Sequence, residues 1–194
     1  MGKSTVLGMF RDLGALTLDA DAIVDMLLSD AGALQKIREA FGDIVFLCES
    51  LDRSALASII FRDIEKREIL ERILHPLVFK EIENFLEETE RRKKGSEIVV
   101  IEIPLLFETG YMHKCDKKIT VYTPEEVALS RLEHKGVAKE QALSRLRTQM
   151  PIEEKIKMAD FCINNGGTIG ETGDQVQKIY ARLLLDLRGG GNRE

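Results

Sequence analysis

The sequence predicts an α/β fold in which a mostly parallel β-sheet is flanked by helices. Residues 98–103 and 118–122 are rich in β-branched residues and almost continuously apolar, as expected of strands covered on both faces. Helical patterns separate the predicted strands along the chain, and this alternation is typical of a parallel sheet. The 194 residues suit one ordinary domain, or a compact domain with small insertions.

The first half of the chain is predicted to be mostly helical, with one short strand. Asp52 is a suitable N-cap, and His75-Pro76 is expected to interrupt the long helix because proline disfavours helix at the preceding residue. The charge run at residues 87–94 indicates a solvated helix end. The expected elements are helices at 2–13, 22–28, 33–41 and 52–90, and a strand at 15–19.

The second half alternates more regularly between strands and helices. Its expected strands are 98–103, 118–122 and 161–164, and its expected helices are 125–135, 139–149, 152–158 and 174–187. Two helical stretches, 33–90 and 125–158, exceed what a crossover between parallel strands requires. They are therefore candidate insertions over the carboxyl edge of the sheet, where ligands bind in such folds.

The composition argues against several functional classes. Lys and Arg number 28 and Asp and Glu 33, so the net charge is 28 − 33 = −5, and aromatic residues are only 6%; both disfavour a nucleic-acid-binding module. The longest strongly apolar stretch is too short to cross a bilayer, and no signal peptide opens the chain, so we expect a cytoplasmic protein. Cys48, Cys115 and Cys162 suit neither a disulfide framework nor a zinc site and are expected to be buried or half-buried thiols.

Two motifs point to phosphate chemistry. Gly2-Lys3-Ser4-Thr5 resembles the last part of the phosphate-binding loop G-x-x-x-x-G-K-[ST], although an ordinary helix start with a solvated lysine has the same residues. In such a loop, backbone N–H groups bind an anion, the lysine reaches the β- and γ-phosphates, and the hydroxyl helps to hold Mg²⁺. Leu18-Asp19-Ala20-Asp21 follows at the spacing of the next strand of a P-loop kinase. One aspartate can cap the next helix while the other, for which we favour Asp21, accepts or orients the proton of an attacking hydroxyl.

These motifs belong to a larger set of segments that resembles the dephospho-CoA kinase family over nearly the full length of the chain. Their order and spacing are far more specific than the Gly-Lys-Ser-Thr fragment alone. The segments are Gly2-Lys3-Ser4-Thr5, Leu18-Asp19-Ala20-Asp21, Leu51-Asp52-Arg53 with Ile60-Phe61, Leu74-His75-Pro76, Ile103-Pro104-Leu105-Leu106-Phe107-Glu108, Gln141 through Arg145 to Gln149-Met150-Pro151, and Ala159-Asp160 through Ile163 to Asn165.

The resemblance implies transfer of the γ-phosphoryl group of ATP, with Mg²⁺, to the 3′-hydroxyl of dephospho-CoA, giving coenzyme A. It implies a P-loop NTPase-type core formed by residues 1–32, 95–123 and 159–194, a helical substrate domain at 33–94 and a lid at 124–158. It also implies a monomer or weak homo-oligomer whose partners are small molecules, with neither nucleic acid nor membrane among them.

The resemblance also implies roles for single residues. Lys3, Asp21 and Arg145 would be catalytic. Gly2, Lys3, Ser4, Thr5, Arg131 and Asn165 would bind ATP, with the Ser4 hydroxyl on Mg²⁺ and Asn165 at the adenine edge. Asp21, Arg53, His75, Pro104 and Glu108 would line the acceptor side. Purely local roles stay open for several of these: stabilisation of a helix break for His75, a local ion pair for Arg53, a solvated helix position for Arg145 and a loop carboxylate for Glu108.

The sequence also departs from the family pattern. Glu102 stands where the family usually has aspartate, Asp25 where it often has a basic residue or histidine, and His134-Lys135 where it has a second basic lid residue after Arg131. The strand and first glycine that precede the loop in this family lead us to expect about 10–12 further residues upstream of Met1. Two other interpretations stay open: another P-loop small-molecule kinase of the adenylate- or uridylate-kinase type, and a non-catalytic homologue that only binds ligand.

Overall fold

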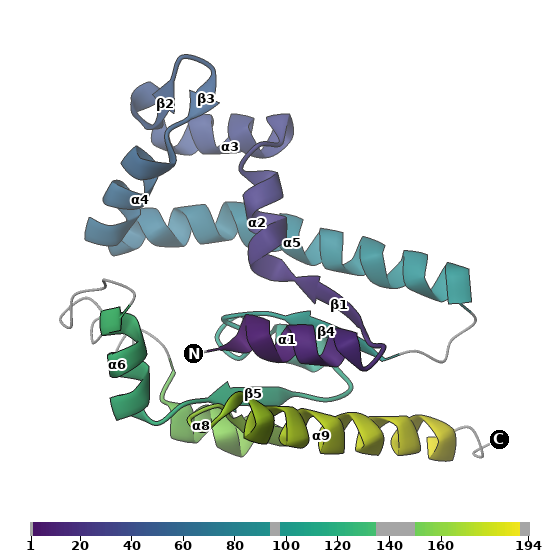
Figure 1. The fold of residues 1–194 in the computed structure, drawn as a ribbon. Coiled ribbons are helices and arrows are strands. Elements are labelled where there is room, and N and C mark those ends of the chain that lie inside the picture. Colours follow the sequence, from purple (N-terminus) through teal and green to yellow (C-terminus); the bar gives the residue numbers. More distant parts are fainter. Residues whose placement is uncertain (1, 94–97, 135–149, 191–194) are drawn as a thin grey trace. The chain divides into compact units, whose positions relative to one another are not determined.

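The computed structural model describes residues 2–93, 98–134 and 150–190 (Figure 1). The chain divides into two compact units, each described here by itself. Unit 1 comprises Met1–Thr17 and Ser96–Glu194, and unit 2 comprises Leu18–Gly95.

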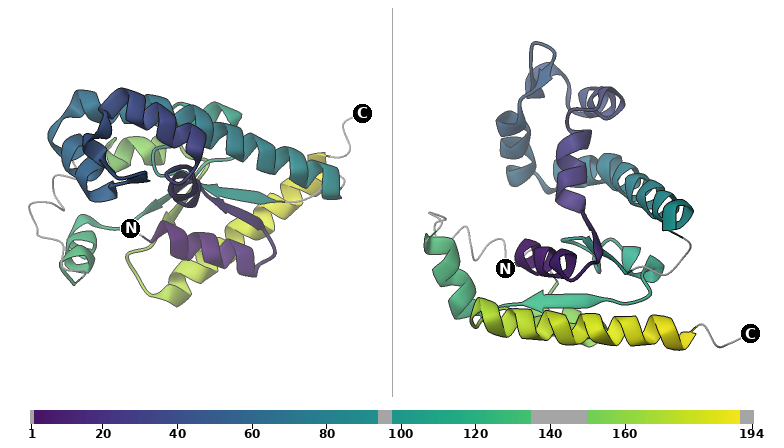
Figure 2. Two further views of the ribbon diagram at one scale, coloured as in Figure 1. Left: turned by 90° about the horizontal axis from the view of Figure 1, so that it is seen from above. Right: turned by 45° about the vertical axis from the view of Figure 1, so that its right-hand side comes forward.

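Unit 1 is the α/β part of the chain. Strands β5 and β6 are parallel, with Ile119 opposite Phe161 and Tyr122 opposite Asn164, while β1 and β4 form a second two-stranded sheet. Helix α9 packs on β6, α8 on β5, and α1 on both α9 and β4 (Figures 1 and 2). The elements are α1 (Lys3–Asp12), β1 (Leu16–Asp19, which enters unit 2 at Leu18), β4 (Val99–Glu102), η2 (Tyr111–Lys114), β5 (Ile119–Tyr122), α6 (Glu125–His134), α8 (Ile152–Met158), β6 (Phe161–Asn164) and α9 (Ile169–Gly190).

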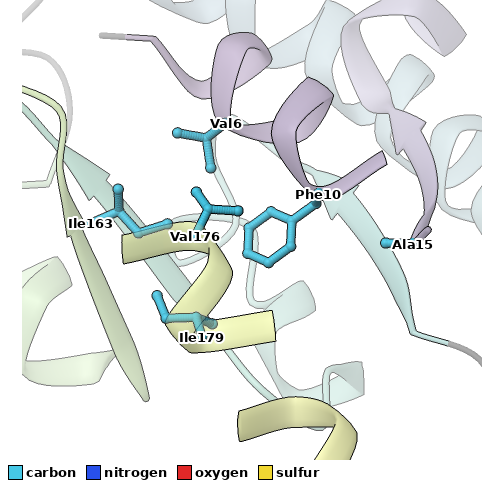
Figure 3. Packing of buried hydrophobic residues seen from close by; sticks show 6 residues of the cluster. All are labelled: Val6, Phe10, Ala15, Ile163, Val176 and Ile179. Carbon is cyan, nitrogen blue, oxygen red and sulfur yellow. The ribbon is translucent and has the colours of Figure 1, made fainter. Parts of the chain in front are cut away.

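The core of unit 1 fixes helix α1 against helix α9. Val6 and Phe10, one turn apart on α1, point toward Val176 of α9 and Ile163 of β6 (Figure 3). Ile163 is 0% exposed, so truncating it to alanine would cost about 2–5 kcal/mol of stability. Because the buried face of α1 includes its first turn, the helix start at Gly2 is held in place by the same packing.

Unit 2 is almost entirely helical. Its longest helix, α5, contacts α2, α3 and α4 (Figure 1), and Leu70, Leu74, Val78 and Ile82 lie buried along it at spacings of four residues. The side chain of Asp52 caps α4, as expected. The elements are α2 (Ala20–Leu27), α3 (Ala31–Phe41), η1 (Asp43–Val45), β2 (Phe46–Leu47), β3 (Ser50–Leu51), α4 (Arg53–Arg62) and α5 (Ile64–Lys93).

The expected helix break at His75-Pro76 is wrong, because α5 continues through Pro76. The buried residues Leu74 and Val78 flank the proline on one face of the helix, and their burial offsets the lost backbone hydrogen bond. The break lies instead at Asp63, between α4 and α5.

Other differences are local. Strands β2 and β3 pair as an antiparallel hairpin that the sequence did not indicate, because two-residue strands carry no measurable alternation. Helix α9 begins at Ile169 rather than at residue 174, because Thr168 and Glu171 form a reciprocal capping box: Thr168 N donates to Glu171 Oε2 (2.7 Å) and Glu171 N to Thr168 Oγ1 (3.2 Å).

The cysteine prediction holds only in part. Cys48, Cys115 and Cys162 are all free thiols, but Cys48 and Cys162 are exposed rather than buried. Cys48 lies at the tip of the β2–β3 hairpin, where it adopts a φ of 55°. The expected helix at 139–149 lies outside the described residues. In the described ranges, no helix combines the length and the apolar character needed to span a bilayer.

Candidate functional site

The start of α1 presents donors for an anion. Gly2 is the N-cap, with φ 83° and ψ 18°, a left-handed conformation that favours glycine. The N–H groups of the next three residues, Lys3, Ser4 and Thr5, have no acceptor within their own helix because they belong to its first turn. Ser4 and Thr5 are exposed, so their hydroxyls can reach a bound ligand.

Glu102 places a carboxylate beside the lysine of this motif. Its Oε1 lies 3.8 Å from Lys3 Nζ, and its side chain is only 7% exposed against 34% for Lys3. Glu102 ends β4 at the sheet edge near the start of α1, as the packing of α1 on β4 requires. No sequence signal pairs these two residues, which are 102 − 3 = 99 positions apart.

Asn165 lies against Gly2. A Cβ atom on Gly2 would stand 1.9 Å from Asn165 Nδ2 and 3.0 Å from Asn165 Cγ, so a side chain at position 2 would force the Asn165 amide to move, in addition to straining the left-handed backbone. The Asn165 Oδ1 atom accepts a hydrogen bond from Thr172 Oγ1 (3.1 Å). Arg131 donates from Nη1 to Asn165 O (2.7 Å) and from Nη2 to Gly167 O (3.5 Å). Gly2, Lys3 and Asn165, which the sequence assigned to ATP, are therefore neighbours in unit 1.

Glu108 lies in the turn that follows β4, and two hydrogen-bond donors from elsewhere in unit 1 hold its carboxylate. Its Oε1 accepts from Lys155 Nζ (2.8 Å) and from Met150 N (3.1 Å). Burial alone would raise the pKa of Glu108, but hydrogen bonds from Lys155, from its own backbone and from Met150, together with the charge of Lys155, lower it below its ordinary value. Pro104 is half-buried at the beginning of the same turn. Lys155 was not singled out in the sequence, where it is one of several charged residues of α8.

Asp19 and Asp21, at the start of helix α2 in unit 2, differ in their contacts. Asp19 is the N-cap of α2, and its Oδ1 accepts from Asp21 N (2.9 Å), which confirms the capping role of one of the two residues. Asp21 lies in the first turn of α2 and is exposed.

The other acceptor residues of unit 2 also have local contacts. Arg53 Nη1 donates to Asp25 Oδ1 (2.5 Å) and Nη2 to Asp25 O (3.0 Å), joining the start of α4 to α2. The His75 ring is half-buried and stacks on Phe79, with ring centroids 5.9 Å apart and an interplanar angle of 30°. Arg145 lies outside the described residues. Within the described ranges, no group of three or more His, Cys, Asp or Glu side chains could hold a metal ion by itself.

A parallel strand pair, helices packed on it and a lysine at a glycine-capped helix start define a P-loop-type phosphotransferase. The sequence profile of the family described as dephospho-CoA kinase matches residues 1–171. The chain belongs to this family and is therefore an ATP-dependent kinase.

Individual relatives agree with this assignment. The dephospho-CoA kinase of Aquifex aeolicus is 40% identical over 187 residues, covering 95% of this chain and 93% of that protein. The dephospho-CoA kinase of Carboxydothermus hydrogenoformans is 40% identical over 184 residues, covering 93% and 88%.

Two solved structures share the fold. One, titled TT1252 from Thermus thermophilus, is 34% identical with a TM-score of 0.78, and the match covers 94% of this chain and 92% of the other. The dephospho-CoA kinase from Campylobacter jejuni is 32% identical with a TM-score of 0.67, covering 95% and 92%. These matches confirm the predicted α/β, P-loop NTPase-type fold class.

Proposed function

We propose that this protein transfers the γ-phosphoryl group of ATP to the 3′-hydroxyl of dephospho-CoA, giving coenzyme A and ADP. Membership of the dephospho-CoA kinase family over residues 1–171 carries this proposal. It favours this acceptor over the nucleoside monophosphates of adenylate- or uridylate-kinase-type enzymes. The Gly2-capped start of α1 supports it, since backbone donors and a lysine meet there.

Unit 1 supplies the nucleotide side of the reaction. The N–H groups of the first turn of α1 bind the phosphates, and Lys3 moves from Glu102 to the β- and γ-phosphate oxygens when ATP arrives. Glu102 thereby holds the ammonium group of Lys3 near its place of action in the free protein. Asn165 holds the adenine edge of ATP, and Arg131 helps Arg145 at the transferring phosphoryl group.

The residues present fit a Mg²⁺ ion. Kinase sites bind Mg²⁺ through few protein oxygens plus phosphates and water, so the exposed Ser4 hydroxyl at the start of α1 suffices as a ligand without a carboxylate cluster. When bound, Mg²⁺ neutralises phosphate charge. Lys3 and the N–H groups of the first turn of α1 neutralise the rest of the phosphate charge.

Unit 2 supplies the acceptor side. Asp21 takes the proton from the 3′-hydroxyl of dephospho-CoA. In the same step the hydroxyl oxygen forms a bond to the γ-phosphorus of ATP, while the bond between that phosphorus and the β–γ bridging oxygen breaks and ADP leaves. Arg53 and His75 bind the acceptor, together with Pro104 and Glu108 of unit 1. Arg145, in the proposed lid at 124–158, stabilises charge on the transferring group. The division into core (1–32, 95–123, 159–194), helical substrate domain (33–94) and lid belongs to the same proposal.

The chemistry also suggests a setting. ATP and dephospho-CoA are small intracellular metabolites, so we propose a cytoplasmic enzyme that acts as a monomer or weak homo-oligomer without nucleic acid or membrane partners. The −5 net charge and the low aromatic content argue against a nucleic-acid partner.

An acceptor panel tests the proposal. Purified protein with ATP and Mg²⁺ is offered dephospho-CoA, AMP or UMP, and ADP release and the mass of the product are followed. Release that depends on dephospho-CoA is expected. Lys3→Met should lower kcat/KM by about 10²–10³-fold, because transition-state charge on the phosphoryl group loses its cation. Arg11→Met, at the exposed other end of α1, is the matched control and should stay near wild type. Phosphorylation of AMP or UMP but not dephospho-CoA would refute the proposal.

A further inference from the structure

We propose that Thr172 is a positioning residue of the nucleotide site, which acts through Asn165 on the Gly2-capped start of α1. The inference rests on one part of the proposed function, namely that the ligand bound at the start of α1 is ATP. Thr172 belongs to no segment that pointed to catalysis in the sequence. The structure nevertheless connects it to the phosphate-binding turn through a single intermediate side chain.

The first step is the burial of Thr172. The residue is 0% exposed on the inner face of α9, four positions before the core residue Val176. Its Oγ1 lies 3.1 Å from Asn165 Oδ1 and 3.1 Å from Thr168 O. The single hydroxyl hydrogen is shared between these two acceptors, and a valine of nearly the same shape could serve neither, so the threonine does more than pack.

The second step is the restraint on Asn165. Its N–H donates to Tyr122 O (2.7 Å), which extends the β5–β6 pairing by one residue, and its carbonyl accepts from Arg131 Nη1 (2.7 Å). The backbone of Asn165 is thus fixed at both polar atoms. The hydrogen bond with Thr172 holds the oxygen end of the side-chain amide toward α9. With Oδ1 at Thr172, Nδ2 lies on the Gly2 side.

The third step is the contact with Gly2. The Asn165 amide occupies the space that a Cβ atom of residue 2 would fill. Gly2 holds a φ of 83°, and its carbonyl accepts the first bond of α1, from Val6 N (3.1 Å). The Asn165 amide therefore packs against the turn from which the first N–H groups of α1 point, and a displaced amide would no longer support that turn. Errors of about 1 Å in such positions can cost about 10²-fold in rate.

The network also gives Arg131 a task in addition to its proposed contact with ATP. Its guanidinium lies on the carbonyls of Asn165 and Gly167, which are 34 and 36 positions away in the sequence. We therefore assign Arg131 to holding the 165–167 turn, from helix α6. Thr172 and Arg131 restrain the same turn from two different helices.

The test compares three substitutions on α9. Thr172→Val removes the hydroxyl and keeps the shape, Thr172→Ser keeps the hydroxyl, and Thr168→Val makes the same chemical change one turn earlier, where the hydroxyl contacts Glu171 instead of Asn165. Each variant is measured for KM of ATP and of dephospho-CoA, for the Kd of a non-hydrolysable ATP analogue, and for thermal midpoint. If Thr172→Val does not fold, Thr172→Ala tests the same loss without excess volume.

For Thr172→Val we expect KM and Kd for the nucleotide to rise about tenfold, the effect of losing one buried hydrogen bond. KM for dephospho-CoA should stay within about twofold, and Thr172→Ser should recover most nucleotide affinity. Thr168→Val should lower the thermal midpoint without changing nucleotide affinity, because it removes a helix cap. Unchanged analogue binding by Thr172→Val, or equal loss by Thr168→Val, would overturn the inference. Because analogue binding needs no acceptor, either result is separate from a failure to phosphorylate dephospho-CoA.

Discussion

Arg53 shows how a residue assigned to substrate can be held in place before the substrate binds. Its guanidinium bridges α4 and α2 through the side chain and carbonyl of Asp25. The two side chains are 52% and 68% exposed, and pairs of this kind contribute little to stability. The pair is therefore better explained as orientation of Arg53 than as a brace of the fold.

Arg53→Ala should raise KM for dephospho-CoA about tenfold while KM for ATP changes by less than about twofold, because a single charge-assisted contact to the acceptor is lost. The thermal midpoint should hardly change. Arg62→Ala, at the exposed far end of α4, is the matched control for charge loss. Steady-state kinetics with each substrate varied in turn measure the effect. A large fall in thermal midpoint with both KM values unchanged would assign Arg53 to structure alone.

Glu108 gives a prediction with a definite pH range. Since the folded-state pKa of Glu108 is lowered by Lys155 and Met150 despite burial, its contribution to stability is complete above the ordinary glutamate pKa, about 4.3. That contribution is lost as the pH falls through the lower folded-state value. Glu108→Gln should therefore lower the thermal midpoint at pH 7, and the gap to wild type should narrow toward pH 4.

Calorimetric melting curves at several pH values measure this gap. Glu154→Gln, exposed on helix α8 one residue before Lys155, removes the same charge without touching the Met150 contact and should show no such pH dependence. A gap of constant size between pH 7 and pH 4 would mean that the Glu108 carboxylate does not stabilise the 104–109 turn through its charge.

At the scale of elements, helix α5 contains a proline in its interior, which lowers the stability of the helix. Proline in a helix interior loses one backbone hydrogen bond and costs about 3 kcal/mol relative to alanine. Pro76 is exposed, so alanine can replace it without disturbing the core formed by Leu74 and Val78. Pro76→Ala should therefore stabilise the protein by about 1–3 kcal/mol in urea unfolding. We expect a rise in KM for dephospho-CoA at the same time, because the neighbouring His75 would lose its present orientation on Phe79.

Helix α5 supplies its own control. Leu77→Ala, at the half-buried next position, should destabilise the helix through lost packing while leaving the proline in place. Increased stability with unchanged acceptor kinetics for Pro76→Ala would show that the proline has no part in placing His75.

The elements also show what local sequence can and cannot predict. Strands β4 and β5 were predictable because their β-branched, apolar runs are typical of strands covered on both faces. Strand β6 differs, since its residues alternate and Cys162 and Asn164 are exposed. The passage of α5 through Pro76 was not predictable, because packing against α2, α3 and α4 outweighs a local preference. The start of α9 was readable in principle, since Thr168 and Glu171 have capping-box spacing, but the flanking glycines concealed it.

For the whole molecule, the sequence indicated which residues are candidates for the site, but it did not indicate which of them form ion pairs with one another. Lys3 and Asp21 stand in recognisable motifs, whereas Lys3 with Glu102 and Lys155 with Glu108 join residues 99 and 47 positions apart (102 − 3 and 155 − 108). A single chain provides no local pattern for such contacts. The first pairing follows from packing of α1 on β4, and the second brings α8 against the turn after β4; only the folded structure defines either.

The two units divide the proposed reaction, and this division is itself testable. Lys3 belongs to unit 1 and Asp21 to unit 2, so loss of the Asp21 carboxylate should leave ATP binding intact. Asp21→Asn should lower kcat about 10²–10⁴-fold, the usual contribution of a general base, with the Kd of a non-hydrolysable ATP analogue unchanged within about twofold. Asp30→Asn, which retains a capping side chain at the start of α3, is the matched control and should keep full turnover. Parallel loss of nucleotide binding and turnover in Asp21→Asn would show that the carboxylate serves the nucleotide rather than the attacking hydroxyl.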